Sequence, residues 1–270
     1  MKFKNLTVSL LMTFILPVII LSQSENVDLA MMNKIKQEGI ENSQIENLAY
    51  ELTDLIGPRL TGSTGFSRGM EWAKMKMEEF GFQNVRIEVA GDFDYSGWDN
   101  LKTYAAMTAP YYSNFACTPV AWTGSTNGAV KGEVIYLDIK SDADFAKYRG
   151  KLSGKIVLLS STQQYEVIFE PLASRFTNEQ LNELSKVTAS RDETFMTFEQ
   201  RSAFYFRNRI NTFVNEEKAA VVLNNMGMFN VPEVTGAYYR QGAKEPVAQL
   251  ALPVEAHGRL ERLLQHNVAV

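Results

Sequence analysis

The chain has 270 residues, of which 45% are hydrophobic and 21% are charged, and its formal net charge is -4. This length is enough for one or two domains that each bury a hydrophobic core. The sequence pI near 5.4 leaves no broad basic surface, so nucleic acid is not an expected partner.

The first 24 residues have the pattern of a secretory signal peptide. Lys2 and Lys4 precede an apolar run that ends at Leu21, and the small residues Ser22 and Ser24 follow it. An uncleaved anchor is the alternative, but polar residues and a proline interrupt the run. We therefore expect an exported protein, periplasmic or extracellular, without a stable membrane span after cleavage.

Two helices and a loop are expected next. Ser43 and Glu46 have the spacing of a capping box, and helical periodicity continues through Ile45, Leu48, Ala49, Leu52, Leu55 and Ile56. Gly57-Pro58 should end this helix. The loop "IGPRLTGSTG" (56–65) is a catalytic loop, an anion cradle or a hinge. Ser63 should cap a second helix that ends at Gly81 and buries Phe66, Met70, Ala73, Met77 and Phe80.

Alternating apolar residues predict a strand over 85–89, and with the two helices it would open an α/β layer in residues 25–95. From about residue 96 the composition changes to turn residues and aromatics. Strands are expected at 133–137 and 155–160, and the segment between them, "FAKYRGKL" (145–152), looks like a helical turn followed by a basic hairpin.

A second capping box starts at Thr177, and apolar periodicity from Ala203 to Val214 predicts a longer helix. The run at 219–223 predicts a strand covered on both faces. A strand over 250–254 should lead into a helix over 255–265. Residues 96–270 thus resemble a self-contained, β-rich α/β unit, and the apolar "NVAV" at the end suggests that the sequence continues in a longer protein.

Side chains for metal chemistry are scarce. The two histidines, His257 and His266, are nine positions apart on one predicted helix and point to opposite sides of it, so they cannot share a metal. His257 and Glu261 share a face, and an exposed His/Glu pair is the favoured interpretation over a two-ligand fragment. The common motifs of metalloproteases, serine hydrolases and nucleotide-binding proteins are absent from the sequence.

Three further features have a functional and a structural interpretation. Cys117 is the only cysteine, and a small buried residue is favoured over a nucleophile. Asp92, Asp94 and Asp99 could form a calcium loop, but a solvated surface is favoured. Arg59 could bind a substrate carboxylate, although a bridge to the carbonyls of the preceding helix is favoured.

The loop "LTDLIGPRLTGSTG" resembles the entry signature of the zinc-dependent aminopeptidase and carboxypeptidase family that includes aminopeptidase Y and plasma glutamate carboxypeptidase. The matching residues are Gly57, Pro58, Arg59, Gly62 and Ser63. The continuation "MEEFGFQNVRIEVA" is similar to the helix, glycine and strand that follow in that family. By this resemblance the loop is a scaffold hinge between the opening helices of the peptidase domain.

The later segments resemble a protease-associated domain that many members carry as an insert. They are "GAVKGEVIYLD", "FAKYRGKLSGKIVLLSS", "EEKAAVVLNN" and "LALPVEAHGRLERLL". The resemblance implies an α/β fold, peptide substrates and two zinc ions that activate a water. The family's zinc ligands and general base come after the insert, so no residue of this chain is expected to be a catalytic residue or a metal ligand.

We therefore expect the N-terminal portion of an exported zinc exopeptidase, an amino- or carboxypeptidase that is inactive without the region after residue 270. A homodimer is one candidate assembly. The alternative is a non-catalytic protease-associated module that binds proteins or peptides.

Overall fold

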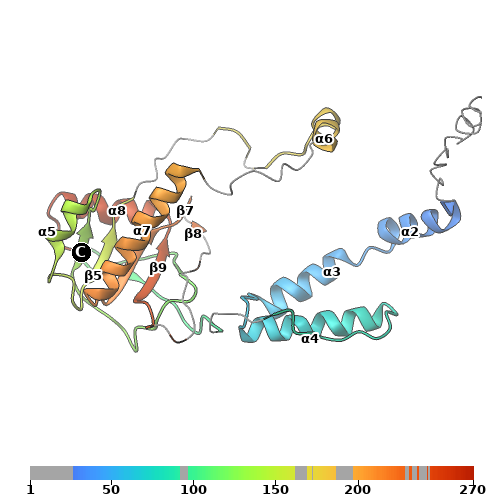
Figure 1. The fold of residues 1–270 in the computed structure, drawn as a ribbon, viewed down its shortest axis with the longest axis horizontal. Helices are drawn as coiled ribbons and strands as arrows, with labels where there is room; N and C mark the ends of the chain where they lie inside the picture. Colours follow the sequence, from blue (N-terminus) through green and yellow to red (C-terminus); the bar gives the residue numbers. More distant parts are fainter. Residues whose placement is uncertain are drawn as a thin grey trace, which may run out of the picture. The chain divides into compact units, whose positions relative to one another are not determined.

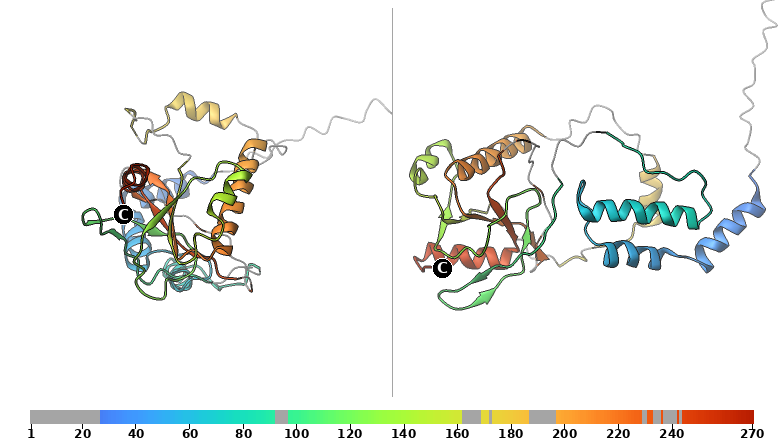
Figure 2. Two further views of the ribbon diagram at one scale, coloured as in Figure 1. Left: turned by 90° about the vertical axis from the view of Figure 1, so that its left-hand side faces the viewer. Right: turned by 90° about the horizontal axis from the view of Figure 1, so that it is seen from below.

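The structure is a computed structural model that describes residues 27–91, 97–161, 169–171, 173–186, 197–228, 231–232, 236, 242 and 244–270. The chain divides into two compact units between Gly57 and Pro58, and Figures 1 and 2 show its ribbon. The predicted signal peptide lies outside the described residues. Among the helices of the described part, none is both long and apolar enough to cross a membrane. The expected domain boundary at 95/96 stays a prediction.

The first unit contains α2 (Leu29–Glu41), α3 (Ile45–Tyr50) and the π-helical turn η1 (Glu51–Ile56). Asp28 caps α2, because its carboxylate accepts the N–H groups of Ala30 and Met31, both at 3.0 Å. The capping box predicted at Ser43 is wrong. The N-cap of α3 is Gln44, which makes no side-chain capping bond, and the Ser43 hydroxyl accepts only the N–H of Ile45 at 3.4 Å.

None of the residues of α2, α3 and η1 is buried. Of the apolar residues at helical spacing, Ile45 and Leu55 are 72% and 61% exposed, whereas Leu48, Leu52 and Ile56 are half-buried. Periodicity therefore located the helix correctly, whereas burial needs a second surface that the described part of this unit does not supply.

Helix α4 (Thr64–Glu79) begins and ends as its sequence predicts. The Ser63 hydroxyl accepts the N–H of Phe66 at 3.0 Å. At the other end Gly81 has a φ of +86°, its N–H donates to Glu78, and the N–H of Phe82 donates to Met77. This pair of bonds is a Schellman motif, which requires the left-handed conformation that glycine adopts without strain.

Two predictions about the region around α4 are wrong. The expected inner face of α4 is wrong in its second half: Met77 and Phe80 are 49% and 55% exposed, whereas Phe66, Met70 and Ala73 are half-buried. The fully buried residues of α4 are Gly65 and Gly69. Residues 85–89 do not form a strand; Val89 is 90% exposed. A strand requires a neighbour to satisfy its backbone groups, and none of the described residues pairs with this segment.

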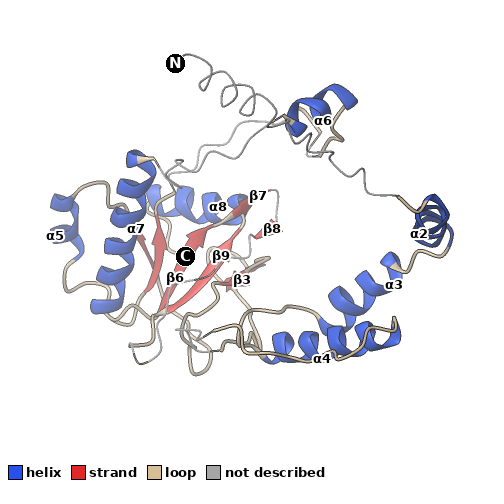
Figure 3. Cartoon of the chain, turned by 45° about the vertical axis from the view of Figure 1, so that its right-hand side comes forward, coloured by secondary structure: helices blue, strands red, loops and turns tan. Residues whose placement is uncertain are grey.

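The larger unit is built on a sheet of five strands in the described part, in the order β3-β9-β6-β5-β4. Figure 3 labels β3, β9 and β6 of this sheet. Strands β4, β5, β6 and β9 are parallel, and β3 pairs with β9 in the antiparallel direction. The strands are β3 (Thr118–Pro119), β4 (Val134–Leu137), β5 (Ile156–Leu159), β6 (Val221–Asn225) and β9 (Ala248–Leu252).

Helices cover both faces of this sheet. Helices α5 (Phe145–Tyr148) and α7 (Phe198–Glu216) belong to the crossovers between parallel strands, and α8 (Val254–Gln265) follows β9. Successive strand residues alternate between two hydrophobic clusters: Val157 packs with Phe213 and Val214 of α7, whereas Leu158 packs with Leu252 and with Leu260 of α8. The fold class is therefore α/β, as predicted, with a parallel-rich sheet between two helical layers.

Most predicted elements of this unit are confirmed. Strands β4, β5, β6 and β9 and helices α7 and α8 lie within a few residues of the expected ranges, and Thr177 caps α6 (Asn178–Ser185) through the predicted box. Residues 145–148 form the expected helical turn α5, but the basic hairpin is wrong because β4 and β5 are parallel. The shorter elements are η2 (Asp142–Asp144), β1 (Ala106–Met107), β2 (Ser113–Asn114), β7 (Gly227–Met228) and β8 (Val231–Pro232).

Candidate functional site

The signature loop requires glycine at two positions because of its backbone. Gly57, which follows η1, has a φ of +79°, and Gly62 has a φ of +75°. Both lie in the left-handed region, where a Cβ atom is strained. Between them Pro58 cannot continue a helix. The buried Ser63 then starts α4. The five signature residues therefore form a turn between two helical segments.

Two more glycines are required because the backbone passes very close to itself. A Cβ atom built on Gly65, in the first turn of α4, would lie 2.0 Å from the carbonyl oxygen of Pro58. A Cβ atom on Gly97 would lie 2.0 Å from the carbonyl oxygen of Gly62. Any other residue at these positions forces the backbone to move. The loop is therefore held between the start of α4 and residue 97.

A carboxylate of the chain occupies the amino end of α4. The Asp99 carboxylate accepts the Thr64 N–H, with oxygen distances of 3.3 and 3.2 Å, and the Thr64 hydroxyl at 2.9 Å. Helix N-termini favour negative charge because their first N–H groups have no partner in the helix. Asp99 thus fills the position that the anion-cradle interpretation assigned to a ligand. The other members of the suggested calcium loop, Asp92 and Asp94, lie outside the described residues.

The residue before Asp99 connects this end of α4 to the sheet. The Trp98 indole N–H donates to the carbonyl oxygen of Thr123 at 3.0 Å. Thr123 is buried, its hydroxyl donates to the carbonyl oxygen of Val120 at 2.7 Å, and it accepts the N–H of Gln249 in β9 at 3.3 Å. Residues 97–99, which we call the strap, therefore link the signature loop to strand β9.

The strap favours the hinge interpretation of the loop over a catalytic one. Ser63 is buried and its hydroxyl is used as a helix cap, so it does not present a nucleophile. Arg59 is exposed, and both of its suggested roles, binding a substrate carboxylate and capping the preceding helix, stay predictions. The sequence alone did not indicate the contacts that Trp98 and Asp99 make, because Thr64 and Asp99 are 35 positions apart.

His257 is not the exposed residue that its helical spacing predicted. It is 1% exposed, and its Nε2 atom lies 2.7 Å from the carbonyl oxygen of Leu159 in β5. Its Nδ1 atom lies 3.8 Å from a carboxylate oxygen of Glu261. Burial lowers the pKa of His257, although the hydrogen bond with Leu159 and the Glu261 charge act in the opposite direction.

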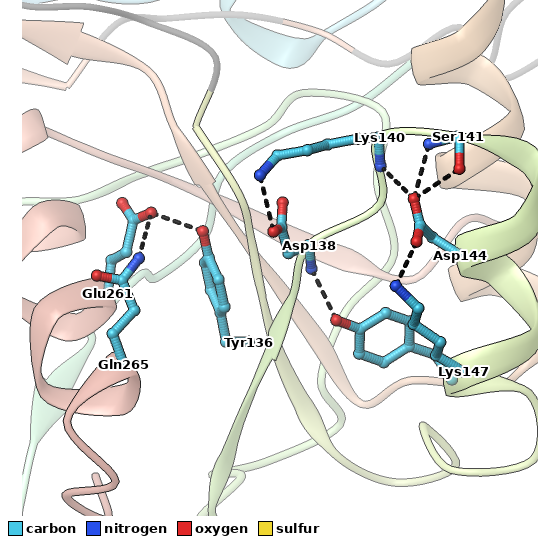
Figure 4. Close-up of polar contacts among 9 residues, drawn as sticks. Tyr136, Asp138, Lys140, Ser141, Asp144, Lys147, Glu261 and Gln265 are labelled. Atoms are coloured by element: carbon cyan, nitrogen blue, oxygen red, sulfur yellow. Dashed lines mark hydrogen bonds and ion pairs between the residues drawn. The ribbon is translucent and has the colours of Figure 1, made fainter.

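Glu261 is shared by two further side chains (Figure 4). The Tyr136 hydroxyl donates to its Oε1 atom at 2.6 Å, and the Gln265 amide donates to the same atom at 3.3 Å. Burial, followed by the Glu261 carboxylate, raises the pKa of Tyr136 above its usual range. The cluster therefore joins β4, β5 and α8.

A second polar group in Figure 4 is a helix start rather than a reactive centre. The Asp144 carboxylate accepts the backbone N–H and the hydroxyl of Ser141, at 2.9 and 2.8 Å, and pairs with Lys147 at 2.5 Å. Lys147 is the largest of the causes that lower the pKa of Asp144. Asp138 lies nearby and pairs with Lys140 at 3.0 Å. These contacts stabilise the turn that begins α5.

The described residues do not fit a zinc site. They contain no group of three or more His, Cys, Asp or Glu side chains arranged around a common point. His257 and Glu261 are already engaged as described above, and His266 lies exposed at the other end of α8.

Cys117 packs beside the second hydrophobic cluster and is half-buried. Burial raises the pKa of its thiol, and a protonated thiol is a poor nucleophile. The structural interpretation of Cys117 is therefore the one that its surroundings favour.

Comparison with known proteins gives a likeness at the level of the fold. No family model matches the sequence, and no curated protein is similar to it. Among solved structures, the peptidase M28 precursor from Shewanella amazonensis SB2B has a TM-score of 0.51 and 15% identity, over 89% of this chain and 48% of that chain. The α/β fold of the chain is thus similar to about half of that peptidase precursor.

Two other solved structures are less similar. An aminopeptidase from Aneurinibacillus sp. strain AM-1 has a TM-score of 0.41 and 14% identity, over 83% of this chain and 42% of that chain. BSAP, a zinc aminopeptidase from Bacillus subtilis, has a TM-score of 0.39 and 13% identity, over 79% of this chain and 39% of that chain. The chain spans less than half the length of each of these three proteins.

Proposed function

We propose that this chain is the N-terminal portion of an exported zinc-dependent exopeptidase, and that residues 96–270 form its inserted protease-associated domain. The observation that supports this most is the fold likeness to a peptidase M28 precursor, which covers 89% of this chain and only 48% of the peptidase. The signature loop adds independent support, since it was identified from the sequence alone.

In this proposal the chain contributes part of the structural framework of the peptidase and affects how substrates reach its cleft. The signature loop and the strap connect α4 with strand β9, through the Asp99 and Trp98 contacts. A framework of this kind can hold an inserted domain in place beside a substrate cleft. The substrates would be peptides, cleaved from one end. The zinc ions would be held by residues after Val270, because the described side chains do not fit them.

The second candidate is a binding module without catalytic activity. It is favoured by the sheet of the larger unit, which has a hydrophobic cluster on each face within the described residues. Such a sheet has the core that independent folding requires. In this case the chain would bind a protein or a peptide and leave it intact.

The test compares the 270-residue chain with a polypeptide that the same gene encodes and that continues about 200 residues further, roughly one more domain. Both are assayed with an aminoacyl reporter and with a peptide that has a free carboxyl end, with and without a chelator, and their zinc is measured by elemental analysis. We expect chelator-sensitive cleavage and bound zinc in the longer polypeptide only.

Two results would contradict the proposal. Chelator-sensitive hydrolysis by the 270-residue chain would mean that its own side chains are sufficient for catalysis. A gene that stops at Val270, together with peptide binding without cleavage, would favour the binding module.

A further inference from the structure

His257 has no role in the proposed function, yet it is one of the least exposed polar residues of the larger unit. Its side chain is 1% exposed and lies between α8 and strand β5. Most histidines of a surface helix face water, where a charge on the ring costs little. A buried imidazole that touches a strand on one side and a carboxylate on the other is unusual enough to require an explanation.

The contacts of His257 determine where its proton lies. The carbonyl oxygen of Leu159, 2.7 Å from Nε2, can only accept a hydrogen bond. Nε2 therefore carries the hydrogen and donates it. In the neutral ring Nδ1 then has a lone pair, which faces the Glu261 carboxylate across 3.8 Å. While the ring is neutral, Nδ1 of His257 and the Glu261 carboxylate are both hydrogen-bond acceptors, so no hydrogen bond joins them. A proton added to Nδ1 would turn it into a donor.

The other elements that pack against α8 bring few titratable groups to this place. Strands β5, β6 and β7 contain none in their sequences IVLL, VVLNN and GM, and β4 contributes Tyr136. Asp138, just after β4, acts on the Tyr136 hydroxyl. Glu261 is therefore the charged side chain that acts on His257 in the described part of the molecule.

Glu261 is held in place by neighbours of its own. It accepts the Tyr136 hydroxyl at 2.6 Å and the Gln265 amide at 3.3 Å, both on Oε1 (Figure 4). The carboxylate is also partly in contact with water, with 23% of the side chain exposed. Water and these two donors weaken the attraction that Glu261 can offer to a charged imidazole.

We propose that His257, Glu261 and Tyr136 form a proton-sensitive latch, which holds helix α8 against strands β4 and β5 at neutral pH and loosens α8 in mildly acidic conditions. The latch holds α8 when the ring is neutral, because the ring then donates its hydrogen bond to the carbonyl oxygen of Leu159 without placing a charge in the core. Adding a proton puts a charge in a site almost without water, and the 3.8 Å separation from Glu261 only partly offsets that cost.

The direction of the pH effect follows from linkage. The pKa of His257 is lower in the folded chain than its usual value of 6.5. The unfolded chain therefore takes up this proton first, and stability that is fully present above pH 6.5 is lost as the pH falls from there toward the folded pKa. Within that window the equilibrium constant for opening should rise by up to about tenfold per pH unit.

The experiment uses the full chain and two measurements. The chain has only two histidines, so imidazole NMR signals of the wild type, assigned with His257→Gln, give both pKa values directly. Hydrogen exchange of the α8 amides at pH 7.5 and 5.5, expressed as protection factors, reports the opening of the helix. His257→Gln can keep a donor for Leu159 but does not titrate, and His266→Gln is the matched control at the exposed end of α8.

We expect a His257 pKa below 6.5, lower protection of α8 at pH 5.5 in the wild type and in His266→Gln, and little change with pH in His257→Gln. A His257 pKa at or above 6.5 would overturn the proposal, even if the Gln variant fails to fold. Greater α8 protection in acid would also overturn it, because the ion pair would then be stronger than the cost of burial. An acid loss of protection that is equal in His257→Gln would assign the effect to other groups.

Discussion

Replacing Gly65 by alanine gives the sharpest test of how the signature loop is held. Alanine is ordinarily the better helix residue by about 1 kcal/mol, and Gly65 lies in the first turn of α4. A new Cβ atom, however, would lie 2.0 Å from the carbonyl oxygen of Pro58 and 3.2 Å from its carbonyl carbon. Both are backbone atoms, so no side-chain rotation can relieve the overlap.

The two effects have opposite signs, and their magnitudes decide the result. Overpacking against a fixed neighbour costs about 1–3 kcal/mol in well-packed regions, and an overlap of this size should be at the upper end. After the helix gain of at most about 1 kcal/mol, we expect Gly65→Ala to lower the free energy of unfolding by about 1–2 kcal/mol. The loop and the first turn of α4 should become less protected.

Gly258→Ala is the matched control. Gly258 lies inside α8, and the nearest atom to its new Cβ would be the flexible end of Arg262 at 3.1 Å. We expect this variant to be stabilised by about 0.5–1 kcal/mol. Urea unfolding followed by circular dichroism measures both variants, and hydrogen exchange of α4 locates the effect. If Gly65→Ala were stabilised as much as Gly258→Ala, this would contradict the claim that the Pro58 carbonyl leaves no room for a Cβ atom at position 65.

Three further predictions concern the same unit. Ser63→Ala should cost about 1 kcal/mol of unfolding free energy, measured in urea, because the N–H of Phe66 loses its acceptor; no loss would mean that the cap contributes nothing. Asp99→Asn should cost about 0.3–1 kcal/mol at low salt and less in 1 M NaCl, because the negative charge at the α4 terminus is removed; a salt-independent difference would contradict the charge argument. Leu252→Ala should cost about 2–5 kcal/mol, since Leu252 is fully buried, whereas Leu101→Ala, at 94% exposure, should change stability by less than about 0.5 kcal/mol.

The predictions that were confirmed concern features whose stabilising interactions are made with residues a few positions away in the chain. The caps at Ser63 and Thr177 and the C-terminal glycine Gly81 bond to groups three to five positions away. The helices and strands in residues 133–265 were likewise predicted from the spacing of their apolar residues, because the side of each element that faces the core must be apolar. The local sequence was therefore sufficient for the α/β class and for most of the sheet.

The predictions that failed needed a partner from elsewhere in the chain. Residues 85–89 alternate like a strand but have no neighbouring strand in the described part. Met77 and Phe80 are spaced like a buried face but remain exposed. Strand β6 also extends beyond the predicted apolar run 219–223 to Asn224, which is buried and whose side-chain amide donates to the side-chain carbonyl of Gln249 in β9 at 3.0 Å.

By itself the sequence determined most helices and strands of the larger unit and the caps at Ser63 and Thr177, since each depends on residue type and short spacing. Only the tertiary structure decided that Asp99 lies at the start of α4, that Trp98 ties the loop to the sheet, and that His257 is buried against Leu159. These contacts join residues 25 to 98 positions apart. The energy of each contact depends on which surfaces pack together in the folded chain, and the local sequence pattern does not contain that information.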